Sequence, residues 1–170
     1  MSLGFAGSGA ELAVGIAGMI VAQGQDERIV THALGSCIAL TVFDPVAEVG
    51  GVLHYVLDRP RSAKLTEEQS EGMFASTGVP AFFNEAYALG ASKDRMIVCA
   101  AGAAEMLGGA GGLQIGKRNQ MMLRKILWKS GVTLAAEDTG GSVSRRLRMN
   151  LKSGLIEIHA QGKRKKLWTP

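Results

Sequence analysis

The sequence predicts a layered domain of the α/β or α+β class, in which short strands alternate with a few helices. Its 170 residues are enough for one hydrophobic core, and we expect a single domain over residues 1–170. The composition, 46% hydrophobic and 20% charged residues, is that of a folded globular protein and excludes a disordered chain. The prediction rests on short β-branched runs that are separated by turn residues and on a few stretches that carry helix signals.

The first part of the chain is rich in strand patterns. Residues 14–21 and 28–31 are apolar and β-branched, which predicts two strands. Residues 38–43 and 49–57 form two further apolar runs, separated by the short Pro-containing segment 44–48. Two such runs joined by a short loop predict a β-hairpin.

Helix signals follow the hairpin. Thr66-Glu67-Glu68-Gln69 matches a capping box with acids in the first turn, which predicts that a helix begins there. We expect Gly78-Val79-Pro80 to interrupt it, so that a second helix covers residues 81–89 and ends at Gly90. Residues 119–130 place apolar side chains on one helical face and predict an amphipathic helix.

Later strands are expected where apolar residues run together or alternate with polar ones. The segments are residues 96–101, 132–136, 143–149 and 155–160.

The longest apolar run is too short for a membrane span. It covers eleven residues, 12–22, whereas a spanning helix needs about 20. No basic residue precedes it, because the first Lys or Arg is Arg28, so the run also lacks the basic start of a signal peptide. We therefore expect a cytoplasmic protein without membrane insertion. Two cysteines are too few for a disulfide framework.

Positive charge gathers at the end of the chain. Residues 143–170 hold eight basic residues and one acid. One interpretation is a solvated strand face followed by a basic tail, residues 161–170, without regular structure. The alternative is an electrostatic footprint for nucleic acid or an acidic partner. No aromatic residues are interleaved for base stacking, so we expect no nucleic-acid partner.

Cys37 and His54 carry the clearest chemical signal. They stand seventeen positions apart, and their midpoint falls between Pro45 and Val46, inside the predicted hairpin loop. A regular hairpin centred there places them directly opposite each other, with Cβ atoms about 4.5–5.5 Å apart. An imidazole beside a thiol accepts its proton and later protonates the leaving group, which is the arrangement of a cysteine nucleophile.

The neighbours of this pair have expected roles of their own. Gly35 and Ser36 directly precede the thiol and predict a turn that exposes it, with backbone N–H groups free nearby, and we expect both residues to contact substrate. A third group usually holds the imidazole in one orientation. The candidates are Thr31, His32 and Asp58, and spacing alone does not choose among them.

The remaining cysteine and histidine are expected to have no chemical role. Cys99 lies in an apolar run and is interpreted as a small buried hydrophobe, and His159 lies on an alternating strand. No Cys-x-x-Cys or His-x-x-x-His spacing occurs, so we expect no metal. The glycine-rich segment 108–112 lacks the Gly-Lys-Ser/Thr ending of a P-loop, so we expect a loop there and no nucleotide cofactor.

Four segments stand in a fixed order along the chain. They are Thr31 with Leu34-Gly35-Ser36-Cys37, Gly50-Gly51-Val52-Leu53-His54, Ile115-Gly116-Lys117-Arg118-Asn119, and Asp138-Thr139-Gly140-Gly141 followed by Arg145-Arg146. In this order and spacing the chain resembles, over about residues 14–160, the CheD family of chemoreceptor glutamine deamidases. The resemblance implies that Cys37 is the nucleophile, His54 the catalytic histidine and Thr31 the third catalytic residue.

The resemblance also implies a fold and an activity. The fold is α+β, a three-layer sandwich of two packed β-sheets with flanking helices, similar to toxin deamidases of the cysteine-hydrolase type. The activity is cysteine-dependent deamidation of glutamine side chains in chemoreceptor cytoplasmic domains, without a cofactor, and some family members also hydrolyse glutamate methyl esters. A CheC-type phosphatase is the expected protein partner.

One departure from the family pattern concerns the segment after the central strand. The family typically reads Phe-Gly-Gly-Ala there, whereas this chain reads Ala101-Gly102-Ala103-Ala104. Two alternative functions stay open: a binding module that docks on a CheC-type phosphatase or receptor with little catalysis, and a thiol amidase or esterase that acts on small molecules.

Overall fold

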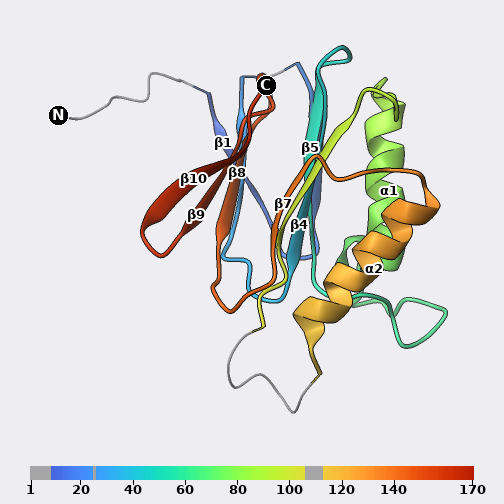
Figure 1. The fold of residues 1–170 in the computed structure, drawn as a ribbon. Coiled ribbons are helices and arrows are strands. Elements are labelled where there is room, and N and C mark those ends of the chain that lie inside the picture. Colours follow the sequence, from blue (N-terminus) through green and yellow to red (C-terminus); the bar gives the residue numbers. More distant parts are fainter. Residues whose placement is uncertain (1–8, 25, 106–112) are drawn as a thin grey trace.

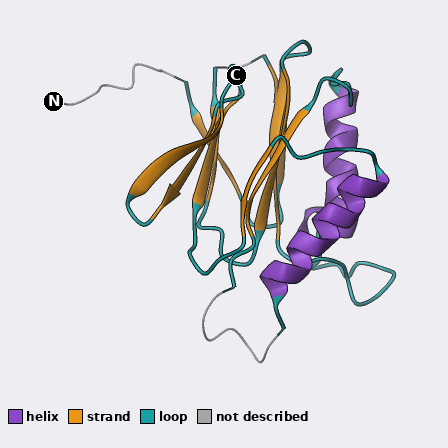
Figure 2. Cartoon of the chain, viewed as in Figure 1, coloured by secondary structure: helices purple, strands orange, loops and turns teal. Residues whose placement is uncertain are grey.

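Two packed β-sheets and two α-helices form three layers. The computed structural model describes residues 9–24, 26–105 and 113–170, and within them each sheet has five strands. Figure 1 shows the sheets face to face, with α1 and α2 outside the sheet that contains β4 and β5. In Figure 2 both helices lie on that one side. The predicted α+β three-layer sandwich is confirmed.

The sheets are defined by the following elements. The first sheet has the order β1 (Glu11–Val14), β3 (Arg28–Thr31), β8 (Arg146–Asn150), β9 (Ile156–Ala160) and β10 (Lys163–Trp168). The second has the order β2 (Met19–Gln23), β5 (Val49–Tyr55), β4 (Ile38–Asp44), β6 (Ile97–Gly102) and β7 (Ala136–Thr139). A 3₁₀ turn, η1 (Glu71–Met73), precedes α1 (Ala75–Ala88), and α2 (Ile115–Lys129) connects β6 to β7.

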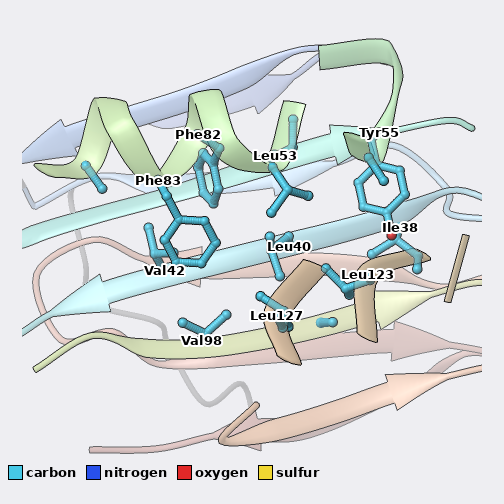
Figure 3. Packing of buried hydrophobic residues seen from close by; sticks show 14 of the residues in the cluster. Ile38, Leu40, Val42, Leu53, Tyr55, Phe82, Phe83, Val98, Leu123 and Leu127 are labelled. Atoms are coloured by element: carbon cyan, nitrogen blue, oxygen red, sulfur yellow. The ribbon is translucent and has the colours of Figure 1, made fainter. Parts of the chain in front are cut away.

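The helices pack on the second sheet through one apolar cluster. On β4 this face carries Ile38, Leu40 and Val42, and on β5 it carries Leu53 and Tyr55. Figure 3 shows these side chains beside Phe82 and Phe83 of α1 and Leu123 and Leu127 of α2. Burial of this apolar area is the main force that holds the helices on the sheet.

The opposite face of the same strands builds a second cluster, between the two sheets. Ala39 and Phe43 of β4 and Val52 of β5 meet Ile29, Leu147, Met149 and Ile158 of the first sheet there. Every residue of β4 and β5 is buried. Burial on both faces explains why these two strands appear in the sequence as almost continuous apolar runs.

The predicted hairpin forms, but its register differs from the expected one. His54 lies opposite Ala39, and Asp44 lies opposite Val49. Direct opposition of Cys37 and His54 is therefore wrong by two residues. The cause is Asp44, whose Oδ1 accepts hydrogen bonds from the N–H groups of Val46 (2.9 Å) and Ala47 (3.1 Å) and so shifts the centre of the turn toward the second strand.

The predicted helix at residues 66–69 is also wrong. Gln69 accepts a hydrogen bond from the Thr66 N–H through its side chain (3.1 Å) and donates one from its backbone to the Thr66 carbonyl (3.0 Å), but only a turn results. The chain then runs beside the end of β5, where Val56 and Leu57 both donate to the Met73 carbonyl. The first helical residues after this polar segment are those of the short 3₁₀ turn η1.

Pro80 does not interrupt α1, which runs through it to Ala88. The proline is exposed, and the buried face of the helix includes Val79, Phe82 and Phe83. Their packing on the sheet outweighs the cost of about 3 kcal/mol for a proline within a helix. The end of the helix before Gly90 agrees with the sequence, and Gly90 has a φ of 100°.

Three further expectations need correction or qualification. Residues 14–21 are not one strand, because a turn at 15–18 separates β1 from β2. The basic tail is not irregular: β10 pairs antiparallel with β9, and Trp168 packs near Phe43 (ring centroids 6.3 Å apart), so apolar contacts fix its end. Segment 108–112 lies outside the described residues.

Among the described helices, none has the length and apolar character needed to cross a bilayer.

Candidate active site

Cys37 lies at the end of the connection that carries the chain from β3 in one sheet to β4 in the other. The backbone of this connection is held at several points. Leu34 and Arg145 exchange N–H···O bonds of 2.6 and 3.2 Å, Ala104 donates to the Gly35 carbonyl (2.9 Å), and Ala103 donates to the Cys37 carbonyl (2.8 Å). The Cys37 side chain is half-buried and packs against the cluster between the sheets.

The carbonyl groups of this connection are bound, whereas several N–H groups are not. Within the described residues, the backbone N–H groups of Gly35 and Ser36 have no acceptor, and that of Cys37 has only its own sulfur nearby. Successive free N–H groups in a turn can bind an anionic oxygen. The predicted turn with free N–H groups is present, at the position expected for Gly35 and Ser36.

The segment after β6 fits closely around Cys37. Gly102 has a φ of 120°, and a Cβ atom there would overlap the Cys37 carbonyl oxygen. The next residue, Ala103, has a φ of 55°, in the left-handed region that favours glycine. The departure from the family pattern thus places alanine in a backbone conformation that glycine adopts without strain.

His54 lies near the end of β5 on the same inter-sheet face as Cys37. It alternates with Val52, which belongs to that cluster, and it faces the small side chain of Ala39 across the strand pair. The His54 side chain is fully buried, and neither ring nitrogen has a hydrogen-bond partner among the described residues. The predicted shared face is therefore correct, although no hydrogen bond joins the thiol to the imidazole.

Thr31 reaches the same inter-sheet layer from the opposite sheet. It alternates with the buried Ile29 on β3 and is itself 5% exposed. Its Oγ1 accepts a hydrogen bond from the Leu147 N–H (2.9 Å), so the hydroxyl proton stays available to a further acceptor.

The other two candidates for a third group differ from Thr31. Asp58 is paired with Arg118 (3.1 Å). Both residues line a cavity of about 380 Å³ beside the end of β5, which neither Cys37 nor His54 lines. His32 is exposed and has a repulsive interaction with His54.

Both groups of the proposed pair are held in their neutral forms. Burial raises the pKa of the Cys37 thiol, and its own backbone N–H offsets part of this effect. Burial lowers the pKa of the His54 imidazole, and repulsion from His32 lowers it further. Near neutral pH the site therefore pairs a protonated thiol with an imidazole able to accept its proton.

The remaining cysteine and histidine lie away from this site. Cys99 is fully buried, and burial raises the pKa of its thiol to about 11. His159 belongs to β9 in the other sheet. Within the described part of the chain, no group of three or more His, Cys, Asp or Glu side chains is placed to hold a metal ion.

Two residues that support the site received no role from the sequence. Arg145 holds the turn before β8 through its guanidinium, which bonds Asp138 Oδ1 (2.9 Å) and the carbonyls of Gly140 and Val143. Asn119 bonds the backbone on both sides of the site. Both belong to the motifs that carry the family resemblance, which was the available signal.

Comparisons with known proteins bear on the family of the chain. The sequence profile described as CheD chemotactic sensory transduction matches residues 57–160. A relative from Solibacter usitatus (strain Ellin6076) is 40% identical over 157 residues, which cover 92% of this chain and 93% of that protein. The chain belongs to the CheD family. The resemblance found in the sequence is thereby confirmed.

The relatives within the CheD family carry a consistent name. The Solibacter protein is called a probable chemoreceptor glutamine deamidase CheD. A protein from Anaeromyxobacter dehalogenans (strain 2CP-C), 42% identical over 86% of this chain and 92% of its own length, is called a probable chemoreceptor glutamine deamidase CheD 2. A protein from Pyrococcus abyssi (strain GE5 / Orsay) is also called a probable chemoreceptor glutamine deamidase CheD. It is 35% identical over 87% of this chain and 90% of its own length.

Proposed function

We propose that this CheD chain is a cysteine-dependent deamidase that converts glutamine side chains of chemoreceptors to glutamate. The observation that carries the proposal is the half-buried Cys37 thiol, preceded by free N–H groups and sharing an inter-sheet face with the unpartnered His54 imidazole. The names of the relatives supply the substrate class.

In the proposed first step, His54 takes the proton of the Cys37 thiol as the sulfur attacks the carboxamide carbon. The C–S bond forms while the C=O π bond opens, and we assign binding of the resulting oxyanion to the N–H groups of Gly35, Ser36 and Cys37. His54 then transfers its proton to the departing nitrogen, the C–N bond breaks, and ammonia and a thioester result.

Hydrolysis of the thioester completes the cycle. His54 takes a proton from a water molecule, whose oxygen attacks the thioester carbon, and returns a proton to the departing sulfur. The net reaction consumes one water and one carboxamide and yields one carboxylic acid and one ammonia. Thr31 is the proposed third residue: its buried hydroxyl proton can orient the imidazole, while Leu147 fixes its oxygen.

The deciding experiment measures ammonia release and the Gln-to-Glu mass change on purified cytoplasmic fragments of chemoreceptors. Wild type is expected to react, and Cys37→Ala to show only the rate without enzyme. Cys99→Ala is the matched control, because it removes a fully buried thiol that the mechanism does not use. Equal product with wild type and Cys37→Ala, or none with wild type, would contradict the proposal.

The same preparation tests the alternatives. One alternative is a thiol amidase or esterase that acts on small molecules. It would hydrolyse free glutamine or small esters faster than receptor fragments. A docking module without catalysis would bind a receptor or a CheC-type phosphatase equally well with and without Cys37. A cytoplasmic location and a CheC-type partner belong to this proposal, and co-purification from cells tests both.

A further inference from the structure

Asn119 connects two backbone segments of the site, and its two side-chain hydrogen bonds go to backbone carbonyls rather than to Cys37 or His54. It lies in the first turns of α2 and is fully buried. Its Nδ2 donates hydrogen bonds to the Ser36 carbonyl (2.9 Å) and to the Val56 carbonyl (2.7 Å). Ser36 precedes the proposed nucleophile, and Val56 follows the strand that carries the proposed base.

The orientation of the Asn119 amide follows from its neighbours. A flipped amide would place Oδ1 against two carbonyl oxygens, so Nδ2 must face Ser36 and Val56. Oδ1 is buried and has no partner among the described residues. A buried acceptor without a partner lowers the stability of the fold by about 1–3 kcal/mol. The fold bears this cost at Oδ1 while Nδ2 makes the two hydrogen bonds that hold the site.

The backbone around Asn119 is anchored as well. The buried Tyr55, next to His54 on β5, donates its hydroxyl hydrogen bond to the Asn119 carbonyl (3.0 Å). Gly116, one turn earlier, approaches the 103–104 backbone so closely that a Cβ atom would overlap the carbonyls of Ala103 and Ala104. The N–H groups of these two alanines hold the carbonyls of Cys37 and Gly35. The start of α2 is thus fixed to the nucleophile segment by both side chain and backbone.

This anchoring has a direct consequence for the peptide group between Ser36 and Cys37. In a trans peptide the C=O and N–H bonds point in opposite directions. Because Asn119 holds the Ser36 carbonyl on the side of α2, the Cys37 N–H is directed away from α2. We propose that Asn119 is a positioning residue that orients the Ser36–Cys37 peptide so that the Cys37 N–H can bind the oxyanion. This inference rests on the proposed deamidase function.

The test compares Asn119→Ala and Asn119→Asp with wild type in the ammonia-release assay. Removal of one donor of an oxyanion site typically costs about 10²–10³ in kcat. Loss of its orientation is expected to lower kcat about 10–100-fold, with KM changed less than about threefold. Alkylation of Cys37 by iodoacetamide forms no oxyanion, so its rate is expected to stay within about threefold of wild type.

Two further variants keep the test decisive. Asn150→Ala removes a side chain that also bonds backbone N–H groups, those of Lys152 and Ser153, but in the other sheet, and its kcat should match wild type. Tyr55→Phe keeps the buried ring but removes the hydrogen bond to the Asn119 carbonyl. It also removes the electrostatic interaction of that hydroxyl with Cys37, which the alkylation rate monitors. It is expected to fold and to lower kcat severalfold at constant KM, and it decides the matter if the Asn119 variants do not fold.

The outcomes separate the two proposals. An inactive wild type would reject the deamidase function itself. With an active wild type, unchanged kcat in Asn119→Ala or in Tyr55→Phe would overturn the positioning role. A rise in KM alone, or a parallel loss of kcat and alkylation rate, would also overturn it, because either result would mean that Asn119 acts on substrate binding or on the thiol rather than on the oxyanion donor.

Discussion

Asp44 sets the register of the β4–β5 hairpin, and its charge should therefore contribute measurably to stability. Its side chain is fully covered, yet Arg95, which is 39% exposed, pairs with it at 2.8 Å. Besides the two turn N–H groups, the carboxylate accepts a hydrogen bond from the Ser92 N–H (2.8 Å). One carboxylate thus holds both the hairpin turn and the loop before β6.

The pKa of Asp44 gives the size of the effect. Burial alone would raise it, but the hydrogen bonds from Arg95 and from the N–H groups of Ala47, Ser92 and Val46 prevail and lower it from 3.8 to about 2. This difference corresponds to about 2.5 kcal/mol. Because solvent screens the exposed Arg95, we expect Asp44→Asn to lower the free energy of unfolding by about 1–2 kcal/mol at pH 7.

The dependence on pH follows from the lowered pKa. The unfolded chain protonates this carboxyl near pH 3.8, so the stabilisation is complete above that pH. It is lost as the pH falls toward the folded-state pKa of about 2. Other acids titrate equally in wild type and variant, so the difference between the two proteins isolates Asp44.

Urea unfolding of wild type and Asp44→Asn across about pH 3 to 7 tests this reasoning. The difference in unfolding free energy should be largest at neutral pH and shrink below about pH 4. Asp94→Asn is the matched control, since Asp94 is an exposed neighbour of Arg95 and should have little effect at any pH. A difference that stays constant with pH would refute a stabilising role for the charge.

Two other predictions concern Cys37 and its surroundings. Because burial raises the pKa of Cys37, less than about 1% of the thiol should be ionised at pH 7. The rate at which iodoacetamide alkylates Cys37 should therefore still be rising at pH 9. An inflection of this rate below about pH 7.5 would mean that a thiolate–imidazolium pair forms before substrate binds. Gly102→Ala should destabilise the fold by at least about 1–3 kcal/mol from its φ alone, and by more through the clash with the Cys37 carbonyl. Gly140→Ala has a similar φ of 87° but open space around it, so thermal unfolding that ranks the two variants equally would contradict the clash.

Much of the architecture could be predicted because its signals are local. The double-sided burial of β4 and β5 produces long apolar runs, and Gly90 and Gly131, both with positive φ, end the helices where the sequence places the ends. The hairpin register could not be read from spacing, because it depends on which N–H groups of the turn donate hydrogen bonds to the Asp44 carboxylate. The capping box at residues 66–69 forms only in part: the Gln69 side chain accepts from the Thr66 N–H, and the Gln69 N–H bonds the Thr66 carbonyl in a turn instead of a helix.

The residues proposed for the site could be named from the sequence, but the residues that support them could not. Cys37 and His54 could be found because a two-residue error in register preserves the face of a strand, so both side chains still enter the same layer. Asn119 bonds the Ser36 carbonyl, more than eighty positions earlier in the sequence. Arg145 bonds the Leu34 backbone, more than one hundred positions earlier. No periodicity or turn signal encodes a hydrogen bond between such distant segments.

The neutral state of the proposed pair has a consequence for how the enzyme would work. A thiol and an imidazole that are both desolvated gain little from exchanging a proton before substrate arrives, because burial disfavours the charged forms of both. A carboxamide bound at the N–H groups of Gly35, Ser36 and Cys37 changes this balance, since those donors stabilise negative charge as it moves from sulfur to oxygen. Proton transfer to His54 would then be coupled to the attack on substrate. A resting thiol of this kind also resists oxidation, which requires the thiolate. The rigid anchoring of the Ser36–Cys37 peptide therefore matters more here than in a site with a preformed ion pair, because the oxyanion donors rather than a low thiol pKa would supply the driving force.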